Sequence, residues 1–175
     1  EDYTADFLIL ELQRRRIEYV RFNTDDFPQH TKIVWLLKDN KLDGYFEFQK
    51  QRVAFGQIKS IWYRRPLPPI PSNEITDTTA FEFAAAESQA ALEGVWRSLD
   101  CFWVSHPDSL KRAEVKLLQL RIAADLGFQI PATIVTNDPN AARNFFRYQD
   151  EAVIYKPLRR SRLIRGEDVS LIYTN

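Results

Sequence analysis

The sequence predicts an α/β protein made of two consecutive parts. Segments with the apolar spacing of helices alternate along the chain with short runs that have the character of strands. A chain of 175 residues with 45% hydrophobic and 27% charged residues has the composition of a globular protein. It is also long enough to bury a core without disulfides or metals. The helix–strand rhythm changes near residue 107, which predicts parts of 1–107 and 108–175.

The first part opens with a helix that leads into a β-rich stretch. Apolar positions over 4–16, a candidate N-cap at Asp2 or Thr4, and arginines at the end predict an amphipathic helix. Alternating or continuous apolar runs then predict strands, two of them joined by a turn at 38–41. The expected strands are 18–23, 33–37, 44–49 and 58–63.

A long helix and a short strand complete the first part. Residues 77–99 carry apolar side chains at helical spacing behind a candidate cap, Asp77, and the apolar run 101–104 predicts a buried strand. The segment before them, 64–71, holds four of the 9 prolines and can be neither helix nor central strand. It is read as a rigid connector, with a groove or ligand-binding segment as the alternative.

The second part again alternates helices with strands. A helix over 108–126 is expected to end at Gly127, and Pro139 is expected in the first turn of a helix that runs to Tyr148. Strands are predicted between and after these helices, at 132–136, 152–156 and 169–173.

Composition argues against several function classes. Lys+Arg 24 balances Asp+Glu 24, so we expect no nucleic-acid partner, and no apolar run is long enough to predict a membrane partner. The single cysteine, Cys101, is read as a buried structural thiol and favours the cytoplasm. The chain has no Met and no strand before its first helix, so we expect it to be a piece of a longer protein.

Two lysines are the candidate binding residues. Lys156 ends the apolar run 153–155, where an ammonium group is costly unless an anion such as phosphate neutralises it. Lys116 lies inside a predicted helix, one predicted helix before Lys156. Taken singly, each lysine is also compatible with an ordinary solvated side chain.

The phrases around these lysines resemble the ATP-grasp ligases. They are Lys-Leu-Leu-Gln-Leu at 116–120, a Gly-apolar-X-apolar-Pro-X-Thr turn at 127–133, and a strand ending in Lys-Pro at 153–158. Further phrases are similar to the microviridin-type peptide maturases, a subgroup of that superfamily. The most specific is Trp-Tyr-Arg-Arg-Pro within 61–66, and the others lie at 4–7, 22–28 and 172–175.

The resemblance implies a fold and an activity. It makes 1–107 a pre-ATP-grasp α/β domain and 108–175 the N-terminal ATP-grasp subdomain. Lys116 and Lys156 would then bind the phosphates of ATP, and the ligands of Mg²⁺ would lie outside this chain. The implied reaction is ATP-dependent formation of side-chain ester or amide bonds in a ribosomal precursor peptide, through an acyl phosphate. No catalytic residue and no metal ligand is assigned within this chain.

Several alternatives stay open. A related carboxylate–amine ligase would add amino acids to a protein or small molecule with the same nucleotide site. A non-catalytic module could instead hold a peptide by strand addition at the aromatic segment 45–48. The arginines of 158–166 either clamp phosphate or acidic peptide side chains, or are simply solvated. The oligomeric state is also open, with a homodimer as one option.

Overall fold

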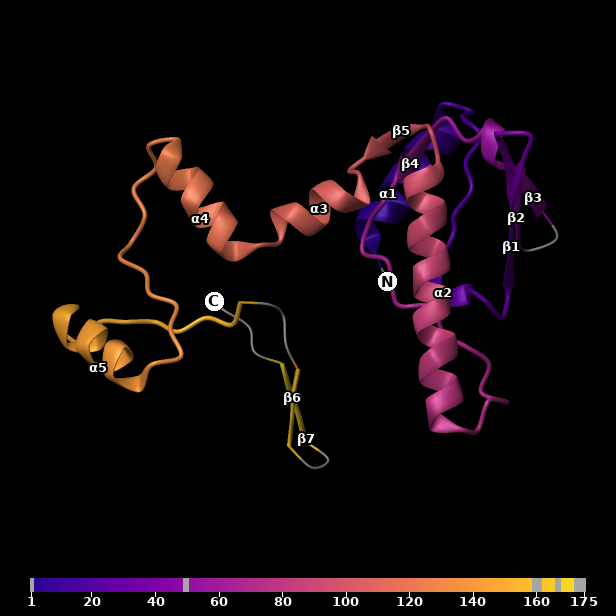
Figure 1. Ribbon diagram of the computed structural model, residues 1–175. Coiled ribbons are helices and arrows are strands. Elements are labelled where there is room, and N and C mark those ends of the chain that lie inside the picture. Colours follow the sequence, from indigo (N-terminus) through magenta and orange to yellow (C-terminus); the bar gives the residue numbers. More distant parts are fainter. Residues whose placement is uncertain (1, 49–50, 159–161, 166–167, 172–175) are drawn as a thin grey trace. The chain divides into compact units, whose positions relative to one another are not determined.

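The computed structural model describes residues 2–48, 51–158, 162–165 and 168–171. The chain forms two compact units, Glu1–Pro107 and Asp108–Asn175, called unit 1 and unit 2 below. Figure 1 shows the helices and strands of each unit. Helices and small sheets occur together, so the predicted fold class is confirmed. No helix in the described part of the chain is both long and apolar enough to cross a bilayer.

Unit 1 contains two sheets and a long helix. Helix α1, Tyr3–Arg14, is capped by the Asp2 carboxylate, and a 3-10 turn, η1, follows at Thr24–Asp26. An antiparallel sheet has the order β1-β2-β3, and β4 and β5 form a parallel pair. The strands are β1 (Thr31–Lys38), β2 (Lys41–Phe48), β3 (Gln51–Ala54), β4 (Ser60–Trp62) and β5 (Phe102–Val104), with a 3-10 turn, η2, at Phe55–Gln57.

Helix α2, Thr78–Ser98, supplies much of the core of unit 1. The Asp77 side chain accepts a hydrogen bond from the N–H of Ala80, which is the expected N-cap. The helix connects β4 to β5, as parallel strands require. Its buried face meets the inner face of the antiparallel sheet in one cluster: Phe46, Phe48, Phe55, Leu92, Val95, Trp96 and Leu99.

Unit 2 contains shorter elements and no buried residue among those described beyond Pro107. Helix α3 (Pro107–Ala113) crosses the boundary between the units. It is followed by α4 (Lys116–Asp125), α5 (Pro139–Tyr148) and a hairpin of β6 (Arg162–Arg165) with β7 (Asp168–Leu171). The cap of α5 is Asp138, whose carboxylate accepts from the N–H of Asn140 at 2.8 Å.

Several predicted elements are wrong in detail. Residues 18–23, 132–136 and 152–156 form no strand, because an extended run becomes a strand only when a partner offers hydrogen bonds. The helix predicted at 108–126 is two helices, because Val115 adopts an extended backbone conformation between α3 and α4. Of the loop predicted at 158–166, residues 162–165 form strand β6, and 159–161 and 166 lie outside the described residues. Of the strand predicted at 169–173, residues 169–171 belong to β7, and 172–173 lie outside the described residues.

Gly44 allows β1 and β2 to approach beneath Phe55. A Cβ atom at this position would lie 2.2 Å from the carbonyl oxygen of Val34 and 2.6 Å from the Phe55 ring, and φ is +154°. We therefore expect Gly44→Ala to lower the free energy of unfolding by at least about 2 kcal/mol, since neither the backbone nor a buried ring can move away cheaply. Urea denaturation followed by circular dichroism measures the change. Gly56→Ala is the matched control, because a Cβ there meets no atom within 4 Å.

A charged cluster lies on the outer face of the antiparallel sheet. Glu47 accepts from Lys32 at 2.8 Å and from Arg52 at 2.8 Å, and the Arg52 guanidinium lies 3.9 Å from the centre of the Tyr45 ring. These hydrogen bonds, first that of Lys32, lower the pKa of Glu47 from 4.5 to about 2.

The pairing of Glu47 should make the stability of the fold decrease as the pH falls. A carboxyl group whose pKa is lower in the folded state stabilises the fold above its unfolded pKa, and loses that effect as pH falls. The contribution of Glu47 should therefore disappear between pH 4.5 and about 2. We expect the stability difference between wild type and Glu47→Gln to shrink steadily over this range. A difference that stays constant down to pH 2 would contradict the assigned pairing.

Candidate functional site

In unit 2 one candidate lysine, Lys116, contacts the Lys-Pro phrase that holds the other. Lys116 is the first residue of α4 and is half-buried, and its ammonium group donates a hydrogen bond to the backbone carbonyl of Pro157. Pro157 follows Lys156 directly, so the start of α4 and the Lys-Pro phrase are held together across 41 residues. This contact joins two of the three phrases on which the resemblance rested.

Lys156 has surroundings that differ from the predicted ones. It lies in an extended segment without strand pairing and is exposed, as are Ile154 at 78% and Tyr155 at 76%. The premise of a lysine at the mouth of a buried strand is therefore wrong. What the structure offers instead is an accessible lysine that precedes Pro157, the residue whose carbonyl accepts the hydrogen bond from Lys116. Two cations drawn from these two segments would suit a polyanion such as a nucleotide phosphate chain.

The third phrase, 127–133, is an extended connection. Gly127 has φ +82° and ends α4, as predicted. The Thr133 hydroxyl donates to the carbonyl of Pro131 at 2.8 Å. Among the described residues no His, Cys, Asp or Glu side chains cluster in a way that could hold a metal ion. No ligand for Mg²⁺ is therefore assigned to them.

In unit 1, the Trp-Tyr-Arg-Arg-Pro phrase lies at the carboxyl end of β4. Arg64 makes a two-pronged ion pair with Asp2, at 2.8 and 3.1 Å, and its guanidinium lies 5.3 Å from the centre of the Trp62 ring. Both charged side chains are largely covered, and the pairing lowers the pKa of Asp2. Asp2 also caps α1, so the pair fixes the start of that helix to the end of β4. The sequence alone does not predict this pair, because Arg64 and Asp2 are 62 positions apart.

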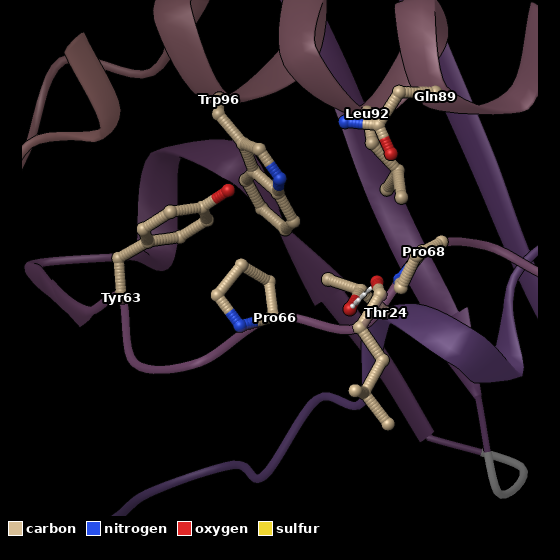
Figure 2. Close-up of a pocket in the computed structure, with 8 residues that line it drawn as sticks. Thr24, Tyr63, Pro66, Pro68, Gln89, Leu92 and Trp96 are labelled. Atoms are coloured by element: carbon tan, nitrogen blue, oxygen red, sulfur yellow. Dashed lines mark hydrogen bonds between the residues drawn. The ribbon is translucent and has the colours of Figure 1, made fainter. Parts of the chain in front are cut away.

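A cavity of about 200 Å³ opens beside this phrase. Figure 2 shows the side chains that line it. They are Trp96, Leu92 and Gln89 from α2, Tyr63, Pro66 and Pro68 from the segment after β4, and Thr24 from η1. The proline-rich segment forms one wall. It is held by hydrogen bonds from Thr24 to the carbonyl of Leu67 at 2.6 Å and from Gln29 to the carbonyls of Ile70 and Pro71, both at 3.1 Å. The segment is thus an anchored connector that also lines a cavity.

The predicted peptide edge at 45–48 is wrong. Strand β2 is the central strand of its sheet, and these residues pair with β1 on one side and β3 on the other. Phe46 and Phe48 are buried at 4% and 8% exposure, in the core cluster. A peptide cannot add at a strand whose edges are already paired, and Phe48→Asp would unfold unit 1 rather than report on peptide binding.

The family description of the MvdD pre-ATP grasp domain matches residues 1–111. The chain belongs to this family. No curated protein matches the sequence. Among solved structures, the macrocyclase MdnC of Microcystis aeruginosa MRC, bound with the precursor peptide MdnA, has a TM-score of 0.89 at 24% identity, over 100% of this chain and 57% of that one. At this identity the likeness shows the fold alone.

Two further solved structures are similar at higher identity. The Chryseobacterium gregarium RiPP-associated ATP-grasp ligase, in complex with ADP and a leader and core peptide, has a TM-score of 0.83 at 28% identity, covering 94% of this chain and 49% of that one. The macrocyclase MdnB of Microcystis aeruginosa MRC has 0.78 at 27%, covering 98% and 55%. The predicted relationship of this MvdD-family chain to the microviridin-type ATP-grasp maturases is confirmed. The chain spans about half the length of these proteins.

Proposed function

We propose that this chain belongs to an ATP-dependent ligase that forms side-chain ester or amide bonds in a ribosomal precursor peptide. In this assignment residues 1–107 are the pre-ATP-grasp domain and residues 108–175 are the N-terminal ATP-grasp subdomain. The observation that carries the proposal is the hydrogen bond from Lys116 to the carbonyl of Pro157, which holds the start of α4 against the Lys-Pro phrase that contains the second candidate, Lys156. The complex of the Chryseobacterium ligase with ADP and peptide supports it.

The proposed reaction has two steps. A peptide carboxylate attacks the γ-phosphorus of ATP, which gives an acyl phosphate and releases ADP. A hydroxyl or amine of the same peptide then attacks the acyl carbon, loses its proton, and displaces inorganic phosphate. Lys116 and Lys156 orient the phosphates and offset their negative charge. This neutralisation matters most in the transition state, where negative charge moves between the phosphate groups. Mg²⁺, when bound, supplies further charge neutralisation, and no residue of this chain is assigned to it.

Titration calorimetry of Mg·ATP into the full-length protein tests the nucleotide site. We expect a single saturable binding event, with ADP competing for the same site. If neither nucleotide binds, the ligase assignment is wrong and a peptide-binding module becomes the better interpretation. The proposed partners are a precursor peptide and ATP. The absence of nucleic-acid and membrane partners and a place in the cytoplasm stay predictions.

A further inference from the structure

The cavity beside the Trp-Tyr-Arg-Arg-Pro phrase holds a hydrogen-bond donor without an acceptor, and we call it the Trp96 cavity. Trp96 is 6% exposed, yet its indole N–H bonds no nitrogen or oxygen of the described residues. None of the described side-chain nitrogens and oxygens is both fully buried and unpaired, so this nitrogen faces accessible space. Figure 2 shows it on the ring edge turned toward Leu92, which also lines the cavity. Because a buried indole N–H normally has an acceptor, the cavity suits a ligand that supplies one.

A hydrogen-bond acceptor faces the same space. The amide nitrogen of Gln89 donates to Glu93 at 2.9 Å, whereas its amide oxygen accepts no hydrogen bond from the described residues. Figure 2 shows this oxygen directed from α2 into the cavity. One free donor and one free acceptor therefore line a space of about 200 Å³. This combination matches a peptide unit, which has one carbonyl acceptor and one N–H donor.

The rest of the lining is largely apolar and is held in place. Leu92, Pro66 and Pro68 offer no polar side-chain atom, and the prolines have no backbone N–H. The wall that the prolines form is fixed by the hydrogen bond from Thr24 to the carbonyl of Leu67 at 2.6 Å. Since an apolar cavity of roughly 150 Å³ already binds benzene, this one can take a whole apolar side chain. A wall that is already ordered keeps the entropic cost of binding low.

The cavity lies at the carboxyl end of the parallel pair β4–β5. Tyr63 and Pro66 line it and follow β4 closely, and the Tyr63 N–H donates to the carbonyl of Val104, where β5 ends, at 2.9 Å. In α/β proteins the carboxyl ends of parallel strands are where ligands bind.

An acidic ligand fits this cavity less well than a neutral one. A carboxylate placed against Leu92 and the two prolines would exchange its water for one neutral donor, which is unfavourable. The neighbouring Arg64 is already paired with Asp2, and Arg65 is exposed and is not a lining residue. The lining therefore selects for an uncharged group.

We propose that the Trp96 cavity is a subsite for an uncharged apolar residue of the substrate peptide. The side chain of that residue fills the space between α2 and the segment 66–68. Its backbone carbonyl accepts from Trp96 Nε1–H, and its backbone N–H donates to the amide oxygen of Gln89. This subsite rests on the proposed function, which supplies a peptide as the substrate. Unit 1 then takes part in choosing which peptide is bound.

Heteronuclear NMR on the full-length protein with isotopically labelled tryptophan tests the donor. The probes are the N-acetyl methylamide of leucine and, as its charged counterpart, that of glutamate. We expect the leucine probe to shift, in a saturable way, the indole signal that Trp96→Phe removes. The signals of Trp35 and Trp62, which are 45% and 36% exposed, should stay in place. A Trp96 signal that moves with neither probe, or with the glutamate probe alone, would overturn the proposal.

Two variants connect the cavity to the peptide. Trp96→Phe keeps an aromatic ring and removes the donor, and Gln89→Leu removes the acceptor. Each should raise the Kd of the precursor peptide, measured by titration calorimetry, about threefold to tenfold, as for one lost hydrogen bond. Trp103→Phe is the matched control, because Trp103 packs against the same core cluster and is not a lining residue. Circular dichroism confirms that each variant is folded.

Failure of this subsite and failure of the proposed ligase give different results. If Trp96→Phe and Gln89→Leu bind the precursor peptide as tightly as Trp103→Phe does, the cavity is not a peptide subsite, even in a protein that binds Mg·ATP and joins side chains. If Mg·ATP does not bind but the leucine probe shifts the Trp96 signal and both variants weaken peptide binding, the ligase assignment is wrong and the subsite stands.

Discussion

Trp96→Ala is expected to lower the free energy of unfolding of unit 1 by roughly 3–5 kcal/mol, the usual cost of removing a buried aromatic side chain. Trp96 is 6% exposed, and its ring centre lies 5.4 Å from that of Phe22, 5.3 Å from that of Phe46 and 6.3 Å from that of Trp103. The substitution would leave a cavity where α2, the antiparallel sheet and the β4–β5 pair all meet.

Urea denaturation followed by far-ultraviolet circular dichroism measures this loss. Phe102→Ala is the matched control, because Phe102 is 69% exposed on β5. We expect its effect to stay within about 0.5 kcal/mol, as for most exposed positions. Equal losses in both variants would show that Trp96 is not the centre of the core.

Lys156→Ala is expected to weaken binding of Mg·ATP to the full-length protein by about 1.5–3 kcal/mol, or roughly 10- to 150-fold in Kd, because a charged hydrogen bond to phosphate is lost. Lys116→Gln should weaken it to a similar extent while keeping a donor for the carbonyl of Pro157. Because both lysines are proposed to bind the same phosphate chain, the double variant should lose less than the sum of the singles.

The control for this pair is Lys111→Ala, a lysine on the exposed side of α3 in the same stretch of sequence. Its Kd for Mg·ATP should match that of the wild type. If Lys156→Ala binds Mg·ATP as the wild type does, Lys156 is not a phosphate ligand. If all three single variants lose affinity for Mg·ATP equally, the loss reflects the lower positive charge of unit 2 and not a specific contact of a lysine with phosphate.

The sequence predicted best the helix ends and turns that depend on residues close together in the chain. The Asp77 cap and the apolar spacing behind it predicted α2 to within a residue at each end, and Pro139 marked the start of α5. These features depend on hydrogen bonds and side chains within a few residues, which a single sequence displays. The turn near 38–41 is confirmed for the same reason, with Asp39 and Asn40 in the left-handed conformation that such a turn favours.

The features that the sequence missed depend on distant partners. Residues 18–23 alternate like a strand, but no neighbouring strand bonds them, and Phe22 packs into the core from an irregular segment. Residues 45–48 looked like an edge because nothing local shows that β3 returns to pair with β2. Periodicity reports which side chains are apolar and does not report which strand becomes central.

The candidate site also has some features that the sequence predicted and others that it missed. Lys116 and Lys156 could be named from the phrases around them, but the hydrogen bond from Lys116 to the carbonyl of Pro157 could not, because it joins residues 41 positions apart. The ion pair of Arg64 with Asp2 was missed for the same reason. A groove at the proline-rich segment was the alternative prediction, but the residues of α2 and η1 that complete the cavity are distant in sequence and could not be named.

The most direct test of the proposed ligase is the mass of a precursor peptide after incubation with the full-length protein, ATP and Mg²⁺. We expect the peptide to lose the mass of one water per bond formed, with one ADP released for each. Without ATP the mass of the peptide should not change. A gain equal to one amino-acid residue would point to the carboxylate–amine ligase instead. A peptide of unchanged mass, recovered from a protein that binds both ATP and the peptide, would contradict the proposed ligase activity.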